Sequence, residues 1–159
     1  MKITILCVGK IKEKYFTDAV AEYIKRISRY HKLEIVEVPD EKTPDGAGEA
    51  LNAQIMAREG ERILAKIKEG SYIAALAIEG KQLSSEQLAE KLETLALGGS
   101  SHVTFVIGGS LGLAEEVKKR ADFLLSFSEM TFPHQLMRVV LLEQIYRCCK
   151  ISAHEPYHK

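Results

Sequence analysis

The chain lacks a net charge, a disulfide framework and any CxxC motif. Its 22 basic residues balance its 22 acidic residues, so no global field attracts nucleic acid or an anionic membrane. An RNA partner would therefore need a local basic patch. The three cysteines, Cys7, Cys148 and Cys149, are too few for a pattern of paired disulfides, and we expect buried, inert thiols.

Long hydrophobic runs are also missing. The longest stretch without a formal charge, residues 94–114, is interrupted by glycines and serines, which excludes a membrane-spanning helix there. The apolar run at residues 3–8 is too short for the core of a signal peptide. We therefore expect the chain to stay in the cytosol.

With 159 residues, of which 46% are hydrophobic, the chain has the size of a single domain, residues 1–159. Runs rich in β-branched residues predict strands, and apolar residues spaced by three and four predict helices. The predicted strands are residues 3–8, 33–38, 72–78, 102–107 and 123–127, and the predicted helices are residues 13–30, 49–68, 84–97, 113–121 and 134–150. This alternation predicts an α/β fold with helices on both faces of a mostly parallel sheet of about five strands.

A glycine-rich loop follows the fourth predicted strand, at residues 108–112. It has neither the acidic partner of a dinucleotide fingerprint nor the Lys-Ser/Thr pair of a P-loop, since the next lysine is Lys118. An adenosine compound without phosphates fits this loop better than NAD or ATP, although a tight turn alone would also explain the glycines. Residues 127–133 follow the last strand, and we expect them to share a pocket with this loop, because ligands bind at the carboxyl edge of such sheets.

The last predicted helix, residues 134–150, has apolar residues around most of its circumference. A helix of this kind must be buried on several sides, and a second subunit is the cover that we expect. The alternative is a helix that passes through the core of its own domain.

The string His154-Glu155-Pro156-Tyr157-His158 matches the HExxH motif of zinc proteases. Pro156 disfavours the continuous helix that such a site needs, so we expect no metal. What remains is a cationic tail near Arg147 and Lys150, or simply a frayed end.

Four segments, ITILCVGKIKEKY, VIGGSLGL, LSFSEMTFPHQLMRVVLLEQIYR and PYHK, resemble the family of ribosomal RNA large-subunit methyltransferase H. That family belongs to the SPOUT class of methyltransferases. The resemblance implies a homodimer, a C-terminal trefoil knot and S-adenosyl-L-methionine as cofactor. It also implies methylation at N3 of a pseudouridine in 23S ribosomal RNA.

By the pattern of that family, the cofactor is bound by Leu76, Gly108, Phe127, Ser128, Glu129, Met130, Thr131 and Phe132. Three candidate catalytic residues lie near the end of the sequence. Arg147 would contact a phosphate or the developing anion, His158 or a water would remove the proton, and Tyr157 would stack on or bond to the base.

The neutral net charge favours recognition of a shaped site on an assembled ribosome rather than of free RNA. Lys10, Lys12 and Lys14 follow the first strand and are candidates for phosphate contacts, or else are solvated lysines. The competing classes are a non-enzymatic RNA- or ribosome-binding module, a nicotinamide-dependent oxidoreductase and a zinc hydrolase. Neither the composition nor the motifs assign a role to the Cys148–Cys149 pair.

Overall fold

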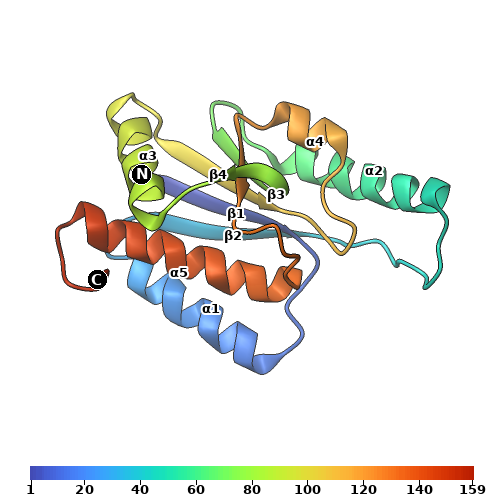
Figure 1. Cartoon of the computed structure of the whole chain (residues 1–159), viewed down its shortest axis with the longest axis horizontal. Coiled ribbons are helices and arrows are strands. Elements are labelled where there is room, and N and C mark those ends of the chain that lie inside the picture. Colours follow the sequence, from blue (N-terminus) through green and yellow to red (C-terminus); the bar gives the residue numbers. More distant parts are fainter.

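The computed structural model describes all residues, 1–159, as a five-stranded sheet with helices on both faces (Figure 1). The strands are β1 (Lys2–Val8), β2 (Lys32–Val38), β3 (Tyr72–Gln82), β4 (His102–Ile107) and β5 (Phe123–Ser126). Their spatial order is β2-β1-β4-β3-β5, and every neighbouring pair is parallel. The predicted α/β class and the parallel sheet are confirmed.

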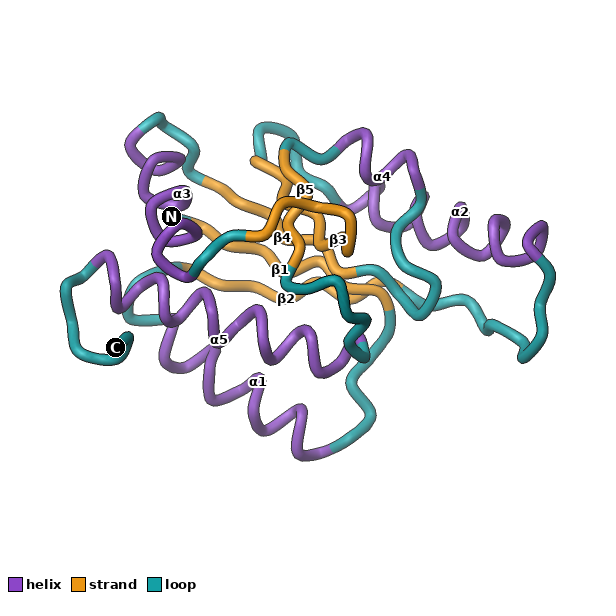
Figure 2. The backbone as a smooth tube through the Cα atoms, in the orientation of Figure 1, coloured by secondary structure: helices purple, strands orange, loops and turns teal.

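Five helices cover the sheet: α1 (Lys14–Ile27), α2 (Glu49–Lys66), α3 (Ser85–Leu97), α4 (Glu115–Arg120) and α5 (His134–Ser152). Figure 2 shows α1, α5 and α3 over one face, with α5 beside α1, and α2 with α4 at the opposite side. None of these helices has both the length and the apolar composition that crossing a bilayer requires.

Two hydrophobic cores follow from the alternation of side chains along the strands. In β1, Ile3 and Ile5 pack in the core beneath α1, α3 and α5, whereas Leu6 and Val8 pack in the core beneath α2 and α4. All four side chains are no more than 1% exposed. Both faces of the central strands are therefore buried, which accounts for their nearly continuous apolar sequences.

Two local features of the structure have simple causes in the sequence. β2 lies at the edge of the sheet, and its alternation of apolar residues with Glu34 and Glu37 is typical of a strand with one solvated side. Helix α3 begins with a capping box, in which the Ser84 hydroxyl accepts a hydrogen bond from the Gln87 N–H (3.1 Å) and the Gln87 side chain accepts one from the Ser84 N–H (2.9 Å).

β3 is longer than the sequence predicts, because residues 79–82 extend it rather than forming a loop. β5 pairs with β3 twice. Leu125 is the partner of Leu76 and again of Lys81, with an irregular turn between the two. The backbones meet closely at this turn, since a Cβ atom added to Gly80 would lie 2.6 Å from the carbonyl oxygen of Leu124. The threading of a C-terminal knot, which the family resemblance implies, stays a prediction.

The apolar circumference of α5 has an explanation within the chain. Leu141, Leu142 and Ile145 are fully buried in the core between α1, α3 and the sheet, and Cys148 and Cys149 are 3% and 4% exposed. Burial raises the pKa of both of these thiols to about 12, so they stay protonated and inert. The helix thus passes through the core of its own domain, which is the alternative to a second subunit. The helix pattern alone therefore does not require a second subunit.

The close approach at Gly80 generates a prediction. Gly80→Ala should lower the free energy of unfolding by about 2–3 kcal/mol, because its Cβ would collide with backbone atoms that cannot yield cheaply. Gly48→Ala is the control, since nothing lies within 4 Å of the added atom. Its cost should stay below about 1 kcal/mol, that of a poorer helix N-cap. Equal urea-unfolding curves for the two variants would contradict the close contact between β3 and β5.

Candidate functional site

A cavity of about 710 Å³ opens at the carboxyl edge of the sheet. Most of its lining comes from three segments: the end of β3, the glycine-rich loop after β4, and the loop between β5 and α5. Side chains from α2, α4 and the first turn of α5 complete it. Its size lies within the range of small-molecule sites, and its lining is mostly apolar or backbone. The carboxyl edge is where ligands bind in parallel α/β sheets.

Seven of the eight residues predicted to bind a cofactor line this cavity. They are Leu76, Gly108, Phe127, Ser128, Met130, Thr131 and Phe132. The eighth, Glu129, is exposed and does not line the cavity. The structure therefore brings together the segments that sequence reasoning selected, apart from one carboxylate that faces solvent.

The glycine-rich loop is folded tightly against itself. The Gly112 N–H donates to the Gly109 carbonyl (3.0 Å), and Gly112 has a φ of 86°, which favours glycine. A Cβ atom at Gly108 would lie 2.8 Å from the Gly112 carbonyl carbon. The loop thus exposes backbone to the cavity where side chains would leave no room.

A buried carboxylate, that of Glu59, packs against this loop. Glu59 of α2 is 4% exposed and accepts a hydrogen bond from the Glu41 N–H (3.0 Å). A Cβ atom at Gly109 would lie 3.0 Å from Glu59 Oε1, so the carboxylate touches the loop. Burial raises the pKa of Glu59.

The charged residues of the cavity do not suit a phosphate. Lys118 is the one cationic lining residue, and its ammonium is bound by the carboxylates of Glu79 (2.5 Å) and Glu115 (3.3 Å). Two carboxylates against one ammonium leave one surplus negative charge. Burial also lowers the pKa of His134, another lining residue, so its imidazole is neutral at pH 7. The cavity therefore fits an apolar or positively charged ligand better than a polyphosphate.

The wall formed by the start of α5 depends on Arg138, which sequence reasoning did not select. Arg138 is only 2% exposed, and its guanidinium forms an ion pair with Glu37 (2.7 Å) and donates to the Gly9 carbonyl (3.2 Å). Arg138 lies one turn after His134, so this contact fixes the first turn of α5 against the ends of β1 and β2. An arginine in an apolar stretch of helix is the feature that could have indicated such a buried partner.

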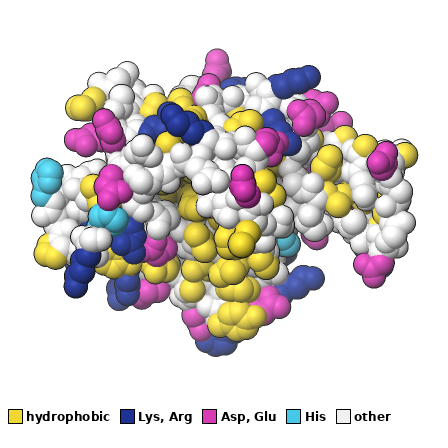
Figure 3. All heavy atoms as spheres, in the orientation of Figure 1, with side chains coloured by type: hydrophobic (Ala, Val, Ile, Leu, Met, Phe, Trp, Pro, Cys, Tyr) yellow, Lys and Arg dark blue, Asp and Glu magenta, His cyan; other side chains and the backbone are white.

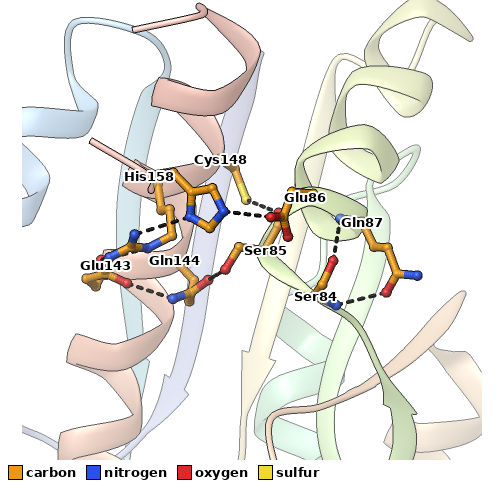
Figure 4. A network of polar contacts seen from close by, with 9 residues as sticks. Ser84, Ser85, Glu86, Gln87, Glu143, Gln144, Cys148 and His158 are labelled. Carbon is orange, nitrogen blue, oxygen red and sulfur yellow. Dashed lines mark hydrogen bonds and ion pairs between the residues drawn. The ribbon is translucent and has the colours of Figure 1, made fainter. Parts of the chain in front are cut away.

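The three predicted catalytic residues form one cluster at the C-terminal end of α5, where Arg147 lies on the helix and Tyr157 and His158 lie in the tail that follows it. Glu143 accepts hydrogen bonds from Arg147 Nη2 (2.5 Å) and from the Tyr157 hydroxyl (3.1 Å), and the Arg147 guanidinium lies 4.7 Å from the centre of the Tyr157 ring. His158 lies 3.3 Å from Arg147 Nη1 on one side. On the other side it lies 2.7 Å from the Glu86 carboxylate of α3, as Figure 4 shows. The tail is therefore ordered by contacts rather than frayed.

These contacts determine the protonation of two groups. Burial, and then the hydrogen bond to Glu143, raises the pKa of Tyr157 to about 12, so the phenol is a proton donor at neutral pH. The backbone N–H of Glu86 itself, and then His158, lowers the pKa of Glu86 to about 2, so this partner of the imidazole is a carboxylate.

The cluster and the cavity are far apart within one chain. None of Arg147, Tyr157 and His158 lines the cavity. The last residue of α5 that lines it is Met137, and Arg147 lies ten residues further along the helix, about 15 Å along its axis. Because α5 runs back across the sheet, one chain holds its two predicted groups of site residues at opposite edges.

The three lysines after β1 lie at the surface. Lys10, Lys12 and Lys14 are exposed, and Lys14 is paired with Asp18 (2.6 Å).

The HExxH string is not helical, since α5 ends at Ser152 and His154 has a φ of 55°. No group of three or more His, Cys, Asp or Glu side chains is arranged to hold a metal ion.

Comparison with known proteins gives a consistent result. Residues 1–158 match the family model described as "Predicted SPOUT methyltransferase". Proteins named ribosomal RNA large subunit methyltransferase H are 65% identical in Bifidobacterium adolescentis and 61% identical in Clostridium novyi, over 100% of both chains in each case. A probable methylase family protein from Haemophilus influenzae is similar in fold, with a TM-score of 0.54 at 12% identity, over 99% of this chain and 70% of that one.

The buried ion pair at the start of α5 should respond unequally to the loss of its two members. Glu37→Gln should lower the free energy of unfolding by about 3 kcal/mol, because it leaves the Arg138 charge buried without its partner. Arg138→Met should cost about 1–2 kcal/mol, since Glu37 is 37% exposed and can be hydrated. The double variant should resemble Arg138→Met. Equal losses for the two single variants in urea unfolding would contradict this assignment.

Proposed function

This chain belongs to the SPOUT methyltransferase family, and we propose that it transfers a methyl group from S-adenosylmethionine to N3 of a pseudouridine in 23S ribosomal RNA. It is an rRNA methyltransferase, as its relatives are named. The observation that carries the cofactor assignment is the electrostatics of the cavity, whose only ammonium is bound by two carboxylates. S-Adenosylmethionine has no phosphate and carries a positive sulfonium, which suits such a site.

We assign the binding of the cofactor to Leu76, Gly108, Phe127, Ser128, Met130, Thr131 and Phe132, which line the cavity. Glu129 belongs to the same segment and is kept as a candidate through its backbone only. When bound, the cofactor supplies a methyl group on a sulfonium centre, which is already a strong electrophile. What the protein adds is position, because an in-line transfer depends on the placement of the acceptor nitrogen.

The acceptor nitrogen is an imide N–H that must lose its proton. Arg147 remains charged and is oriented by Glu143, so we assign to it the stabilisation of the developing anion or of a nearby phosphate. Tyr157 keeps its proton because its pKa is about 12, and it suits stacking or donation to the base. His158 or a water then remains to accept the proton.

The distance between the cavity and this cluster supports a homodimer, in which the tail of one subunit completes the cavity of the other. Large exposed apolar side chains lie around the mouth of the cavity and at the adjoining starts of α5 and α1, where Figure 3 shows a hydrophobic band. They include Ile78 (48% exposed), Met130 (73%), Leu136 (36%) and Tyr15 (66%). Contiguous apolar surface of this kind is typical of protein interfaces.

We further propose that the 159 residues act as one domain on the large ribosomal subunit, in the cytoplasm where ribosomes are. The alternative, a non-enzymatic RNA- or ribosome-binding module, would have no use for a cavity of 710 Å³ with a glycine-rich wall. Lys10, Lys12 and Lys14 remain candidates for phosphate contacts beside the cavity, and no metal is assigned a role.

Calorimetric titration tests the cofactor. S-Adenosylmethionine should bind with one site per chain, whereas NADH and ATP should bind at least tenfold more weakly, because their phosphates meet the surplus carboxylate of the cavity. Lys118→Met, which removes the only ammonium of the lining, should weaken the binding of ATP further. Preferential binding of NADH or ATP would exclude the proposed cofactor.

Mixed dimers test the shared site. Deleting residues 154–159 should leave the binding of S-adenosylmethionine within a few-fold of the intact protein and reduce methyl transfer to ribosomes by orders of magnitude. Thr131→Trp, which fills the cavity from its exposed rim, should abolish binding instead. Neither variant should methylate ribosomes alone, but co-expressed chains should recover activity, because a mixed dimer contains one intact cavity facing one intact tail. No recovery in isolated mixed dimers would place the whole site within one chain.

A further inference from the structure

A second, smaller cavity lies in a groove between α1 and the last turns of α5. Its volume is about 260 Å³, and it is lined by Glu22, Lys25, Arg26, Arg29, Tyr30, Tyr146 and Lys150. Four of these seven side chains are cationic, one is a carboxylate and two are tyrosines. In a chain without net charge, such a concentration of positive charge is local.

Two of the four cations have no ion-pair partner. Arg26 is paired with Glu22 (2.9 Å), and Lys150 is paired with Glu155 of the tail. Lys25 and Arg29 are exposed, and no carboxylate lies within 4.0 Å of either. Four cations against two carboxylates leave two surplus positive charges, both on solvent-facing side chains at the end of α1.

The floor of the groove is aromatic. The Arg26 guanidinium lies 5.7 Å from the centre of the Tyr146 ring, and the Lys150 ammonium lies 5.7 Å from the same ring and 5.8 Å from that of Tyr30. Contacts of this kind hold cations in place over an apolar surface. Tyr146 also packs against Tyr157 (4.9 Å between ring centres), so the groove borders the catalytic cluster.

The groove already binds one anionic oxygen. The Tyr30 hydroxyl donates to Glu155 Oε2 (2.6 Å), and the Lys150 ammonium contacts the same oxygen. A neutral donor and a cation that converge on one oxygen are also what a phosphate group requires. The unpaired Lys25 and Arg29 continue this donor surface along α1.

We propose that the groove between α1 and α5 binds the phosphate backbone of single-stranded RNA next to the nucleotide that is methylated. The inference rests on the proposed function, since it assigns the groove to the same substrate as the catalytic cluster. A cationic groove with aromatic rings in it is the usual combination for single-stranded nucleic acid, because the charges follow the phosphates and the rings accept bases.

The test uses the double variant Lys25→Gln/Arg29→Gln, called the groove variant, which removes the two surplus charges. Its affinity for a fluorescent single-stranded RNA oligonucleotide should fall about tenfold at low salt, and the slope of log Kd against log salt should decrease by roughly 1.4, or 0.7 per phosphate contact. With ribosomes as substrate, KM should rise while kcat stays unchanged, because the two residues contact backbone rather than the reacting base.

Arg58→Gln/Lys66→Gln is the matched control. It removes the same charge from exposed positions on α2, on the other face of the sheet, and should bind RNA like the unmodified protein. Both double variants should bind S-adenosylmethionine normally, which verifies the fold.

Two outcomes would overturn the inference. One is a groove variant that binds RNA no more weakly than the control variant. The other is an unmodified protein that prefers phosphatidylserine vesicles to RNA and loses that preference in the groove variant. If the unmodified protein failed to methylate ribosomes while the groove variant still lost RNA affinity, the proposed reaction would fail and the phosphate site would stand.

Discussion

The direction and length of α5 determine how the rest of the molecule works. Its first turn is fixed at the carboxyl edge of the sheet by the buried guanidinium of Arg138, which joins Glu37 and the Gly9 carbonyl. From there the helix runs back over the sheet between α1 and α3 and delivers the tail to the opposite edge (Figures 1 and 2). A single element thus forms one wall of the cavity and separates the cavity from the predicted catalytic groups.

This separation gives the cavity and the tail different electrostatic characters. The cavity holds one ammonium that is already bound by Glu79 and Glu115, so a positively charged or neutral ligand is favoured there. Around the tail the cations are in excess, and tyrosine rings lie beneath them. A chain with equal numbers of basic and acidic residues can therefore present two surfaces of opposite sign.

The sequence predicts the order and type of all ten elements, because apolar periodicity and caps such as that of Ser84 are local properties. It also selects the walls of the cavity, since loops after parallel strands meet at one edge. It fails where distant segments decide the outcome. Residues 79–82 have the composition of a loop and become strand through pairing with β5. The apolar circumference of α5 suggests a partner subunit, yet α1, α3 and the sheet bury most of it.

No single continuous segment of the chain forms the cavity, and its stability therefore depends on that of the fold. Its residues come from β3, from the loop after β4 and from the segment that joins β5 to α5, together with side chains of α2, α4 and α5, so it exists only when these elements are packed together. No local unfolding unit retains it. A ligand bound there at concentration [L] therefore adds RT ln(1 + [L]/Kd) to the free energy of unfolding of the entire chain. With the methyl donor in this cavity, as proposed, its supply in the cell would protect the protein against unfolding and proteolysis as well as serve its chemistry.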